Sequence, residues 1–334
     1  MDTVKKNVKI AIIGYGNVGR GVMKAIEQNP DMELVCILSR SPERVKNELG
    51  DTVPVFAEDN LLELKKADVA ILCGGSKDDL PVQGPFYAKH INTIDSYDNH
   101  SQALCYFKSM DKAACEAGTV CCVSIGWDPG TFSLQRVLGN AIIPGSKNYG
   151  FYGTGPKGGL SMGHSDAIRS INGVQDARQY THAIAEAIEK VRSGENPELK
   201  PGDMHWRECF VVAKEGANTS AIEHEIKSMS GYFAPYKTVV HFVSQEELDE
   251  KYSGFPHDGL VIGSGRTGDG NHALVEYRNI WDSNPEATAN ILVAHARAAK
   301  RLADENRRGA FTILDIPPAY LSPHSREELI GTFL

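Results

Sequence analysis

Along the first third of the chain, short apolar runs alternate with stretches in which apolar residues recur every three or four positions. Runs of about five apolar residues predict buried strands, and the longer period predicts amphipathic helices. Such alternation is typical of a parallel sheet with helices on both faces, so we expect an α/β fold of the doubly wound Rossmann type. The expected strands are 8–13, 33–38, 69–73, 92–95 and 120–124, and the expected helices are 17–28, 60–66, 81–89 and 109–117.

The pattern changes after Asp128-Pro129-Gly130, where glycine-rich loops and alternating runs such as "YKTVVHFVS" predict antiparallel strands with helices, an α+β domain. A long helical pattern begins near Asn284. The tail from about residue 300 should return to the first domain, because a lone helix with a short strand cannot bury itself. We therefore expect one domain at 1–126, with the tail 300–334 packed on it, and a second domain at 127–299.

Charge and composition exclude several classes of protein. The formal net charge of −8 and the lack of a basic tract argue against a nucleic-acid or membrane-surface partner. No apolar run approaches the ~18 residues of a membrane span. The seven cysteines form no Cys-x-x-Cys pair, which argues against a metal site and favours a reduced compartment. We expect a cytoplasmic protein without a bound metal.

The first expected strand runs into "GYGNVG", a G-x-G-x-x-G motif that opens a helix within a β-α-β unit. This is the context that a dinucleotide site requires. The first glycine permits the tight turn, the second lets a pyrophosphate approach the backbone, and the third lets the helix pack on the strand. The alternative is an ordinary glycine turn before a helix. The expected cofactor-binding residues here are Gly14, Tyr15, Gly16, Asn17, Val18 and Gly19.

The second expected strand ends in Ser39 and Arg40, where NAD sites usually place an acidic residue. A carboxylate would repel a 2′-phosphate, whereas a guanidinium forks onto it and a hydroxyl donates to it. We therefore expect NADP(H); the alternative is that Arg40 is only a solvated loop residue. Residues that follow the later strands should line the same crevice. These are Cys73, Gly74, Gly75, Ser76, Ser96, Tyr97 and Gly126.

Two aspartates follow the fourth and fifth expected strands, Asp98 in "DSYDNH" and Asp128 in "SIGWDPG". Two carboxylates beside a nicotinamide suit a substrate with an ammonium group, since they can pair with it and one can take a proton. Trp127 would supply an apolar wall. Spacing alone leaves open the alternative that both aspartates only cap turns or helices.

Several longer motifs closely resemble the NADP-dependent meso-diaminopimelate D-dehydrogenase family over essentially the whole chain. They include "GYGNVGR", "TIDSYDNH", "SIGWDPG", "GHSDAIR", "GVQDARQYT", "HWRECFVV" and "GAFTILDIPPAYLSP". The resemblance implies reversible oxidative deamination of the D-centre of meso-diaminopimelate to L-2-amino-6-oxopimelate, ammonium and NADPH, a reaction of lysine biosynthesis. It also implies a homodimer whose second domain builds the substrate site and the dimer contact.

The resemblance also assigns residues to the substrate. It places Asp98, Trp127 and Asp128 at the reacting D-amino-acid end and Asn284 toward the L-amino-acid end, and it makes the loop "LSMGHSDA" a cover over the substrate. Arg207 suits a substrate carboxylate; without the resemblance, the alternative is that it is only a surface cation before a strand. Tyr152 stands where some members have Trp, and the loop after it is longer and richer in glycine. The remaining implied substrate residues are Met162, Gly163, Asp166, Thr181 and His257.

Two other functions compete with this one. The first is another NADP-dependent dehydrogenase or reductase of amino-acid metabolism with the same architecture. A semialdehyde dehydrogenase would need a loop cysteine with a nearby histidine, but most cysteines here fall in expected strands and helices. The second is a non-catalytic NADPH-sensing protein, which would not need an acid pair facing an ammonium group.

Overall fold

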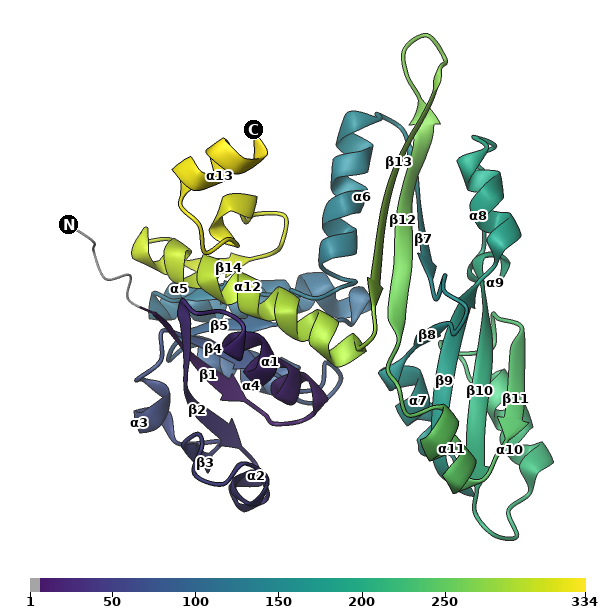
Figure 1. Cartoon of the computed structure of the whole chain (residues 1–334), viewed down its shortest axis with the longest axis horizontal. Coiled ribbons are helices and arrows are strands. Elements are labelled where there is room, and N and C mark those ends of the chain that lie inside the picture. Colours follow the sequence, from purple (N-terminus) through teal and green to yellow (C-terminus); the bar gives the residue numbers. More distant parts are fainter. Residues whose placement is uncertain (1–6) are drawn as a thin grey trace. The chain divides into compact units, whose positions relative to one another are not determined.

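The computed structural model describes residues 7–334, which form two compact units. The first contains the chain up to Leu134 together with Pro285–Leu334, and the second is Gln135–Asn284 (Figure 1). The expected boundaries at 126/127 and 299/300 differ from these. The long helix α12 (Asn284–Asp304) lies almost wholly in the first unit, because Ala289, Leu292 and Val293 are buried in that unit's core. Among the described residues, no helix is long and apolar enough to cross a membrane.

The first unit is built on a seven-stranded sheet in which every neighbouring pair is parallel. Its order is β14-β6-β5-β4-β1-β2-β3. This is the order of a Rossmann-type sheet, extended at one edge by a strand from the C-terminal tail. The doubly wound α/β prediction is confirmed. The strands are β1 (Val8–Ile13), β2 (Met32–Ser39), β3 (Val55–Ala57), β4 (Val69–Leu72), β5 (Asn92–Asp95), β6 (Val120–Cys122) and β14 (Gly309–Phe311).

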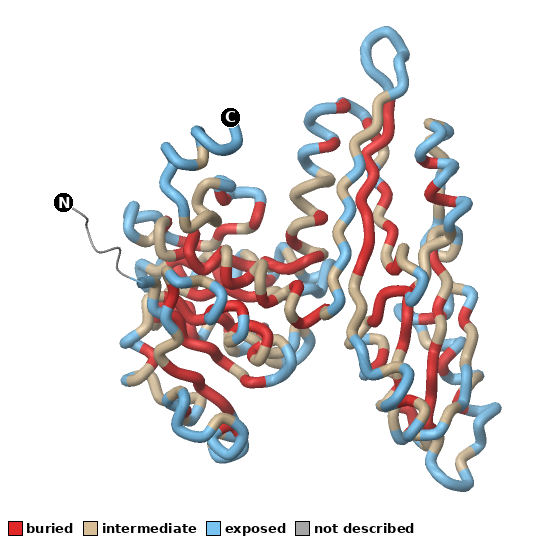
Figure 2. Tube along the Cα trace, viewed as in Figure 1, coloured by how far each residue is buried: buried red, intermediate tan, exposed pale blue. Residues whose placement is uncertain are grey.

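Alternate residues of β1 belong to two different cores, as a strand covered on both faces requires. Ile10 and Ile12 pack with α1 and α12, while Ala11 and Ile13 pack with α4 and α5. The buried sheet between exposed helical surfaces is visible in Figure 2. The helices of this unit, besides α12, are α1 (Asn17–Glu27), α2 (Pro42–Leu49), α3 (Leu61–Leu64), α4 (Leu80–Ala88), α5 (Ala103–Ala117), α13 (Arg326–Phe333) and the 3-10 turns His100–Gln102 and Pro318–Tyr320.

Two elements of the first unit, α2 and β3, are absent from the pattern-based expectation. Val45 is the one buried residue of α2, so the helix shows little apolar period. β3 is a short strand at the edge of the sheet. Helix α5 also begins at Ala103 rather than at residue 109, because its first turn is largely solvent-exposed and Leu104 is 68% exposed.

The second unit contains two sheets, in orders β11-β10-β9-β8 and β13-β12-β7. Their strands pair antiparallel as expected, except that β10 and β11 are parallel. The strands are β7 (Lys147–Tyr152), β8 (Gly159–Leu160), β9 (Val174–Ala183), β10 (His205–Ala213), β11 (Thr238–Phe242), β12 (His257–Arg266) and β13 (His272–Trp281).

The four-stranded sheet is covered on both faces. Ile168 of α7 and Ile222 of α10 pack on one face, and Leu248 of α11 packs on the other. Since side chains alternate along a strand, Thr181 of β9 and Arg207 of β10 belong to the face that α7 and α10 cover. The helices of this unit are α7 (Met162–Arg169), α8 (Ala185–Arg192), α9 (Pro201–Met204), α10 (Thr219–Ser228), α11 (Gln245–Lys251) and most of α6 (Thr131–Ile142), whose first turn belongs to the first unit.

Candidate active site

In the first unit, the loops expected to hold the cofactor all leave the same edge of the sheet. The strands are parallel, so their carboxyl ends lie together, and the connections diverge between the neighbours β1 and β4. Ligands of such sheets bind at this switch point. The loops at this edge are 14–19 after β1, 39–41 after β2, 73–76 after β4, 96–98 after β5 and 124–128 after β6.

The glycine loop has the geometry of a dinucleotide cradle. Gly14 adopts a φ of +90°, which favours glycine. A Cβ on Gly19 would lie 2.3 Å from the Gly14 carbonyl oxygen, so the helix can approach the loop only without a side chain there. At Gly16, a Cβ would meet nothing within 4 Å. Gly16 is also the N-cap of α1, and no side chain caps that helix end. These features fit a pyrophosphate on the backbone N–H groups.

The tyrosine of this loop points inward. Tyr15 is 3% exposed, and its hydroxyl lies 3.5 Å from the Met23 sulfur. Asn17 and Gly16 are exposed beside it, and Val18 is partly exposed. Any contact of Tyr15 with a nucleotide therefore falls to its backbone.

Arg40, directly after the end of β2, forms an ion pair. The Arg40 side chain is 69% exposed and forms an ion pair with Asp79, with Nη1 2.9 Å from Oδ1. Asp79 follows β4, and it also accepts from the Gly75 N–H at 2.9 Å. Ser39 is buried at the strand end, and its hydroxyl oxygen accepts from the Ser41 N–H at 3.1 Å. Arg40 is therefore a largely exposed loop residue in a surface ion pair, and its role toward a cofactor stays a prediction.

The carboxylate of Asp95, at the end of β5, joins two of the site loops. It is fully buried, and its Oδ1 accepts from the N–H groups of Tyr97 at 3.0 Å and Ser124 at 3.1 Å. Its Oδ2 accepts from the Tyr106 hydroxyl at 2.8 Å. Burial raises the pKa of Asp95 to about 6 despite these three donors. The sequence signalled this residue only as a strand end.

Asp98 and Asp128 lie in the two loops that the Asp95 carboxylate joins. Asp98 is exposed, and its backbone N–H donates to the Ser76 hydroxyl at 3.1 Å. Within the described chain its carboxylate caps no helix or turn, so the capping alternative does not hold for Asp98. Asp128 is partly buried in a loop pinched at its base, where a Cβ on Gly130 would lie 1.7 Å from the Gly126 carbonyl oxygen. Trp127, in the same loop, is 7% exposed.

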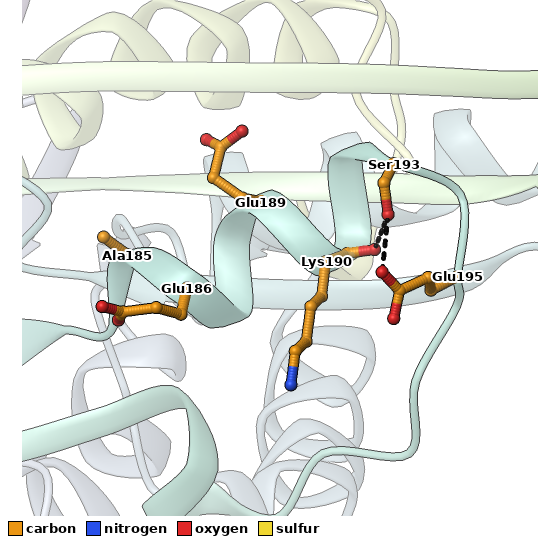
Figure 3. Close-up of a pocket in the computed structure, with 6 residues that line it drawn as sticks. All are labelled: Ala185, Glu186, Glu189, Lys190, Ser193 and Glu195. Atoms are coloured by element: carbon orange, nitrogen blue, oxygen red, sulfur yellow. Dashed lines mark hydrogen bonds between the residues drawn. The ribbon is translucent and has the colours of Figure 1, made fainter.

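In the second unit, an open depression lies along the outer side of α8, lined by three glutamates, a lysine and small residues (Figure 3). None of the site residues expected from the sequence lines this depression, and its side chains offer no set of hydrogen-bond donors directed at one point. Among the described residues, no group of His, Cys, Asp and Glu side chains could hold a metal ion. Four of the expected substrate residues form a group instead where β8, β9 and β10 pair: Thr181, Arg207, His257 and Asn284.

At the centre of that group is a buried guanidinium. Arg207 lies inside β10 directly opposite Thr181 of β9, and it is 8% exposed, so the surface-cation alternative is wrong. It donates to the Thr181 hydroxyl and stacks on the Tyr236 ring, with Cζ 4.1 Å from the ring centroid. Burial lowers the pKa of Arg207. Its Nε has no partner, and among the described residues no carboxylate pairs with it.

Three histidines around the same strands are held neutral; His205 is buried, and His164 and His257 are partly buried. Burial lowers the pKa of His164 and of His205 to about 3, with a further contribution from the Arg207 charge. Burial alone lowers the pKa of His257 to about 4. The Tyr152 N–H donates to Nε2 of His205 at 2.9 Å, and the two rings stack. The local charge is therefore positive and comes from Arg207.

Asn284 fixes the tautomer of His257. The amide nitrogen of Asn284 donates to the Leu160 carbonyl at 3.2 Å, which sets the orientation of the amide. The same nitrogen lies 3.1 Å from Nδ1 of His257, which must then accept. The neutral imidazole therefore carries its proton on Nε2 as a donor, and the Asn284 oxygen is left as an acceptor.

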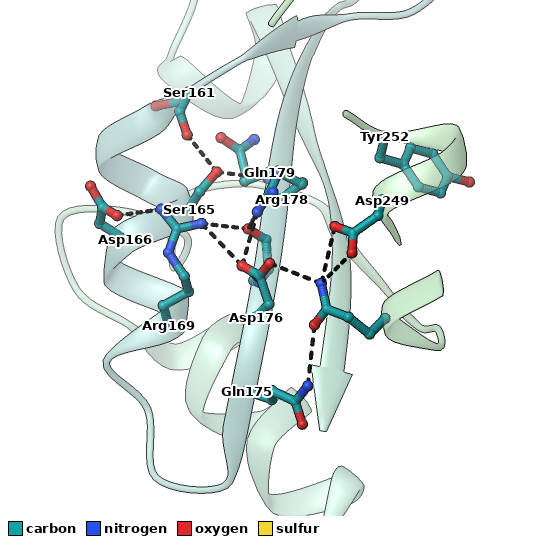
Figure 4. A network of polar contacts seen from close by, with 12 residues as sticks. Ser161, Ser165, Asp166, Arg169, Gln175, Asp176, Arg178, Gln179, Asp249 and Tyr252 are labelled. Atoms are coloured by element: carbon teal, nitrogen blue, oxygen red, sulfur yellow. Dashed lines mark hydrogen bonds and ion pairs between the residues drawn. The ribbon is translucent and has the colours of Figure 1, made fainter. Parts of the chain in front are cut away.

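The stretch "LSMGHSDA", expected as a covering loop, is instead the start of helix α7, capped by the Ser161 hydroxyl. Met162 is partly buried and Gly163 is exposed in its first turn. Asp166 is paired with Arg169, which also binds the Asp176 carboxylate and the Ala177 carbonyl (Figure 4). This network ties α7 to β9, so the expectation of a loop is wrong because local pairing completes a helix.

Two family models match the chain. The diaminopimelic acid dehydrogenase C-terminal domain model matches residues 126–283, and the dihydrodipicolinate reductase N-terminal model matches residues 8–72. A meso-diaminopimelate D-dehydrogenase of Ureibacillus thermosphaericus is 49% identical over 96% of this chain and 98% of its own.

Solved structures agree over nearly the full length. A Corynebacterium glutamicum diaminopimelate dehydrogenase in complex with diaminopimelate is 42% identical, with a TM-score of 0.91 over 98% of this chain and 100% of its own. An engineered D-amino acid dehydrogenase bound to NADP⁺ is 41% identical, with a TM-score of 0.87 over the same shares. The chain belongs to the meso-diaminopimelate D-dehydrogenase family.

Proposed function

We propose that the protein catalyses the reversible, NADP-dependent oxidative deamination of meso-2,6-diaminopimelate at its D-centre. The products are L-2-amino-6-oxopimelate, ammonium and NADPH. The observation that carries the proposal is Arg207, a buried guanidinium without a carboxylate partner among the described residues. An uncompensated buried charge is costly, so its retention points to a ligand that supplies the carboxylate.

The neighbours of Arg207 suit the L-amino-acid end of that substrate. Arg207 can fork onto a carboxylate, and the Thr181 hydroxyl and the Nε2–H of His257 can donate to one. The Asn284 oxygen remains as an acceptor for an ammonium group. We propose that Tyr152, Met162, Gly163 and Asp166 line the same end of the substrate.

The aspartates of the first unit suit the reacting D-amino-acid end. We propose that Asp98 and Asp128 pair with the D-ammonium group and that Trp127 forms the apolar side of this end. One of the two carboxylates takes the proton released as the amine becomes an imine and helps a water molecule add to it. Loss of ammonium then leaves the oxo group. The bound nicotinamide supplies the redox chemistry by accepting the hydride from the D-α-carbon.

The first unit, with its glycine loop and uncapped α1, supports a nicotinamide cofactor. We propose that this cofactor is NADP rather than NAD, because Ser39 and Arg40 stand at the end of β2 where a ribose-binding carboxylate would otherwise stand. The strand-end residues 73–76, 96–97 and 126 would contact the rest of the dinucleotide.

We also propose a cytoplasmic homodimer with no nucleic-acid or membrane partner. Exposed apolar side chains on the second unit support a self-contact: Val137, Leu138 and Ile142 on α6, and Ile280 on β13, which is 64% exposed. Light scattering of the purified chain at several concentrations tests the assembly. A monomer at micromolar concentration would contradict it.

The reaction is tested by following NADP⁺ reduction by absorbance with meso-, LL- and DD-diaminopimelate side by side, and with NAD⁺ in place of NADP⁺. We expect reduction with the meso form and NADP⁺. Reduction with NAD⁺ as fast as with NADP⁺ would contradict the cofactor assignment. Silence with every isomer, despite demonstrated NADPH binding, would contradict the substrate.

A further inference from the structure

The loops that carry the two proposed acid residues are tied to one buried carboxylate. Asp95 stands at the end of β5, three residues before Asp98 and on the strand next to β6, whose loop leads to Asp128. Its Oδ1 accepts from Tyr97, the residue before Asp98, and from Ser124, which starts the other loop. Its own carbonyl accepts from the Ile125 N–H at 2.8 Å. A single residue therefore sets the spacing of both loops.

The loop after β6 begins with a strained backbone conformation at Ser124, next to Asp95. Ser124 has a φ of +55°, in the left-handed region that residues other than glycine rarely adopt. Such strain persists only where the surroundings over-determine the backbone, and it gathers at functional loops. The Ser124 N–H donates to Asp95, and two residues later Gly126 forms an isolated β-bridge with Gly130. The strain redirects the chain toward Trp127 and Asp128.

The surroundings of Asp95 are shaped for this role. The Tyr106 hydroxyl binds Oδ2, and the Tyr106 ring stacks on Tyr97 at a centroid distance of 4.0 Å. A Cβ on Gly84 would lie 2.4 Å from the Tyr106 hydroxyl oxygen, so α4 leaves room for that hydroxyl only because Gly84 has no side chain. The four bonds come from three elements, and Asp95 itself is fully buried, so it cannot reach a substrate.

We propose that Asp95 is a positioning residue for the reaction: it holds the loops of Asp98 and Asp128 in the register in which their carboxylates act on one amino group. The proposal rests on the proposed function, because it concerns the two residues assigned to the D-centre. What Asp95 contributes is the acceptance of two loop N–H groups rather than its charge. An asparagine, whose Oδ1 can accept the same two bonds, should therefore replace it.

The test compares Asp95→Asn, Asp95→Ala and a matched control, Asp111→Ala. Asp111 on α5 likewise accepts a backbone N–H, from Ala310 at 2.9 Å, but it tethers the edge strand β14. We expect Asp95→Ala to lower kcat by about a hundredfold, the size expected for a small misplacement of reacting groups, with NADPH affinity changed much less. Asp95→Asn should keep kcat within about fivefold of the wild-type value, since its loop bonds remain.

Two readouts separate this proposal from a merely structural role and from the proposed function. Hydrogen exchange of the Tyr97 and Ser124 amides should accelerate in Asp95→Ala but not in Asp95→Asn, whatever the substrate. A wild-type protein inactive on every diaminopimelate isomer would refute the proposed function while leaving this exchange result standing. If Asp95→Ala loses no more kcat than Asp111→Ala, or if Asp95→Asn is as slow as Asp95→Ala, the positioning role is wrong. Should Asp95→Ala fail to fold, the retained kcat and amide protection of Asp95→Asn decide the matter.

Discussion

Replacement of Arg207 by methionine should stabilise the ligand-free protein and weaken the binding of the substrate. Methionine has a similar reach and no charge, so it can occupy the place between Thr181 and the ring of Tyr236. The ligand-free protein now buries a guanidinium that is 8% exposed and that no carboxylate of the described chain neutralises. The substitution removes that cost together with one hydrogen bond.

The magnitudes follow from the same contacts. Replacing a poorly compensated buried charge by an apolar side chain stabilises proteins by about 1–4 kcal/mol. Losing the bond to the Thr181 hydroxyl offsets about 1 kcal/mol of this. A substrate carboxylate left without its cation costs about 3–5 kcal/mol, which corresponds to a loss of roughly a hundredfold to a few thousandfold in affinity.

Urea unfolding without ligand, and kcat/KM for meso-diaminopimelate, measure the two effects separately. The matched control is Arg178→Met in the adjacent strand, on the opposite face of the same sheet, where the guanidinium is already paired with Asp176 at 2.9 Å. The control should lose stability and retain kcat/KM. Loss of ligand-free stability in Arg207→Met equal to that of Arg178→Met, or a drop in kcat/KM of less than about tenfold, would refute the reasoning.

Three further changes test other parts of the site. Gly19→Ala places a Cβ 2.3 Å from the Gly14 carbonyl oxygen, so calorimetry should show NADPH affinity weakened by about tenfold or more. Arg40→Gln should weaken NADP⁺ by about ten- to a hundredfold in fluorescence titration, with NAD⁺ affinity nearly unchanged; an equal loss for both would contradict its selectivity role. Folding raises the pKa of Asp95 from 3.8 to about 6. The free energy of unfolding that this shift contributes to the wild-type protein is therefore fully present below pH 3.8 and is lost as the pH rises through 6. Unfolding of Asp95→Asn between pH 4 and 7.5 should therefore show a gain over wild type that grows with pH by at most about 3 kcal/mol.

Much of the first unit could be predicted because its signals are local. Each central strand is a continuous apolar run, as β4 shows with four buried residues, and the glycine loop needs only its own spacing to be recognised. The elements that escaped, α2 and β3, bury too little to leave a periodic signal. The boundary at 284/285 escaped because the packing partner of α12 is remote in sequence: Gly21 of α1 lies against Pro285 and Ala289.

The proposed substrate residues depend on pairings that no local pattern reveals. Thr181 and Arg207 meet only through the register of β9 and β10, across 26 residues of chain. Read alone, Thr181 looks like a strand former and Arg207 like a surface cation. The contacts of Asp95 and His205 are of the same remote kind, since the Asp95 carboxylate accepts from Ser124 and the His205 ring accepts from Tyr152.

Asp95 and Arg207 are both buried and chargeable, yet their surroundings assign them opposite roles. Asp95 has three donors within 3.1 Å, so its acceptor capacity is spent inside the protein and it can only position other groups. Arg207 has a hydroxyl and a ring but no counter-ion in the described chain, so its charge is left for a ligand. In the second unit the surroundings of Arg207 are thus cationic, with the neighbouring histidines held neutral, while in the first unit the loops that follow Asp95 and β6 carry Asp98 and Asp128. The proposed substrate carries both kinds of group, an ammonium group that suits the aspartates and a carboxylate that suits Arg207. We therefore expect a substrate analogue without a second carboxylate to leave Arg207 buried and unpaired, and to bind more weakly than meso-diaminopimelate.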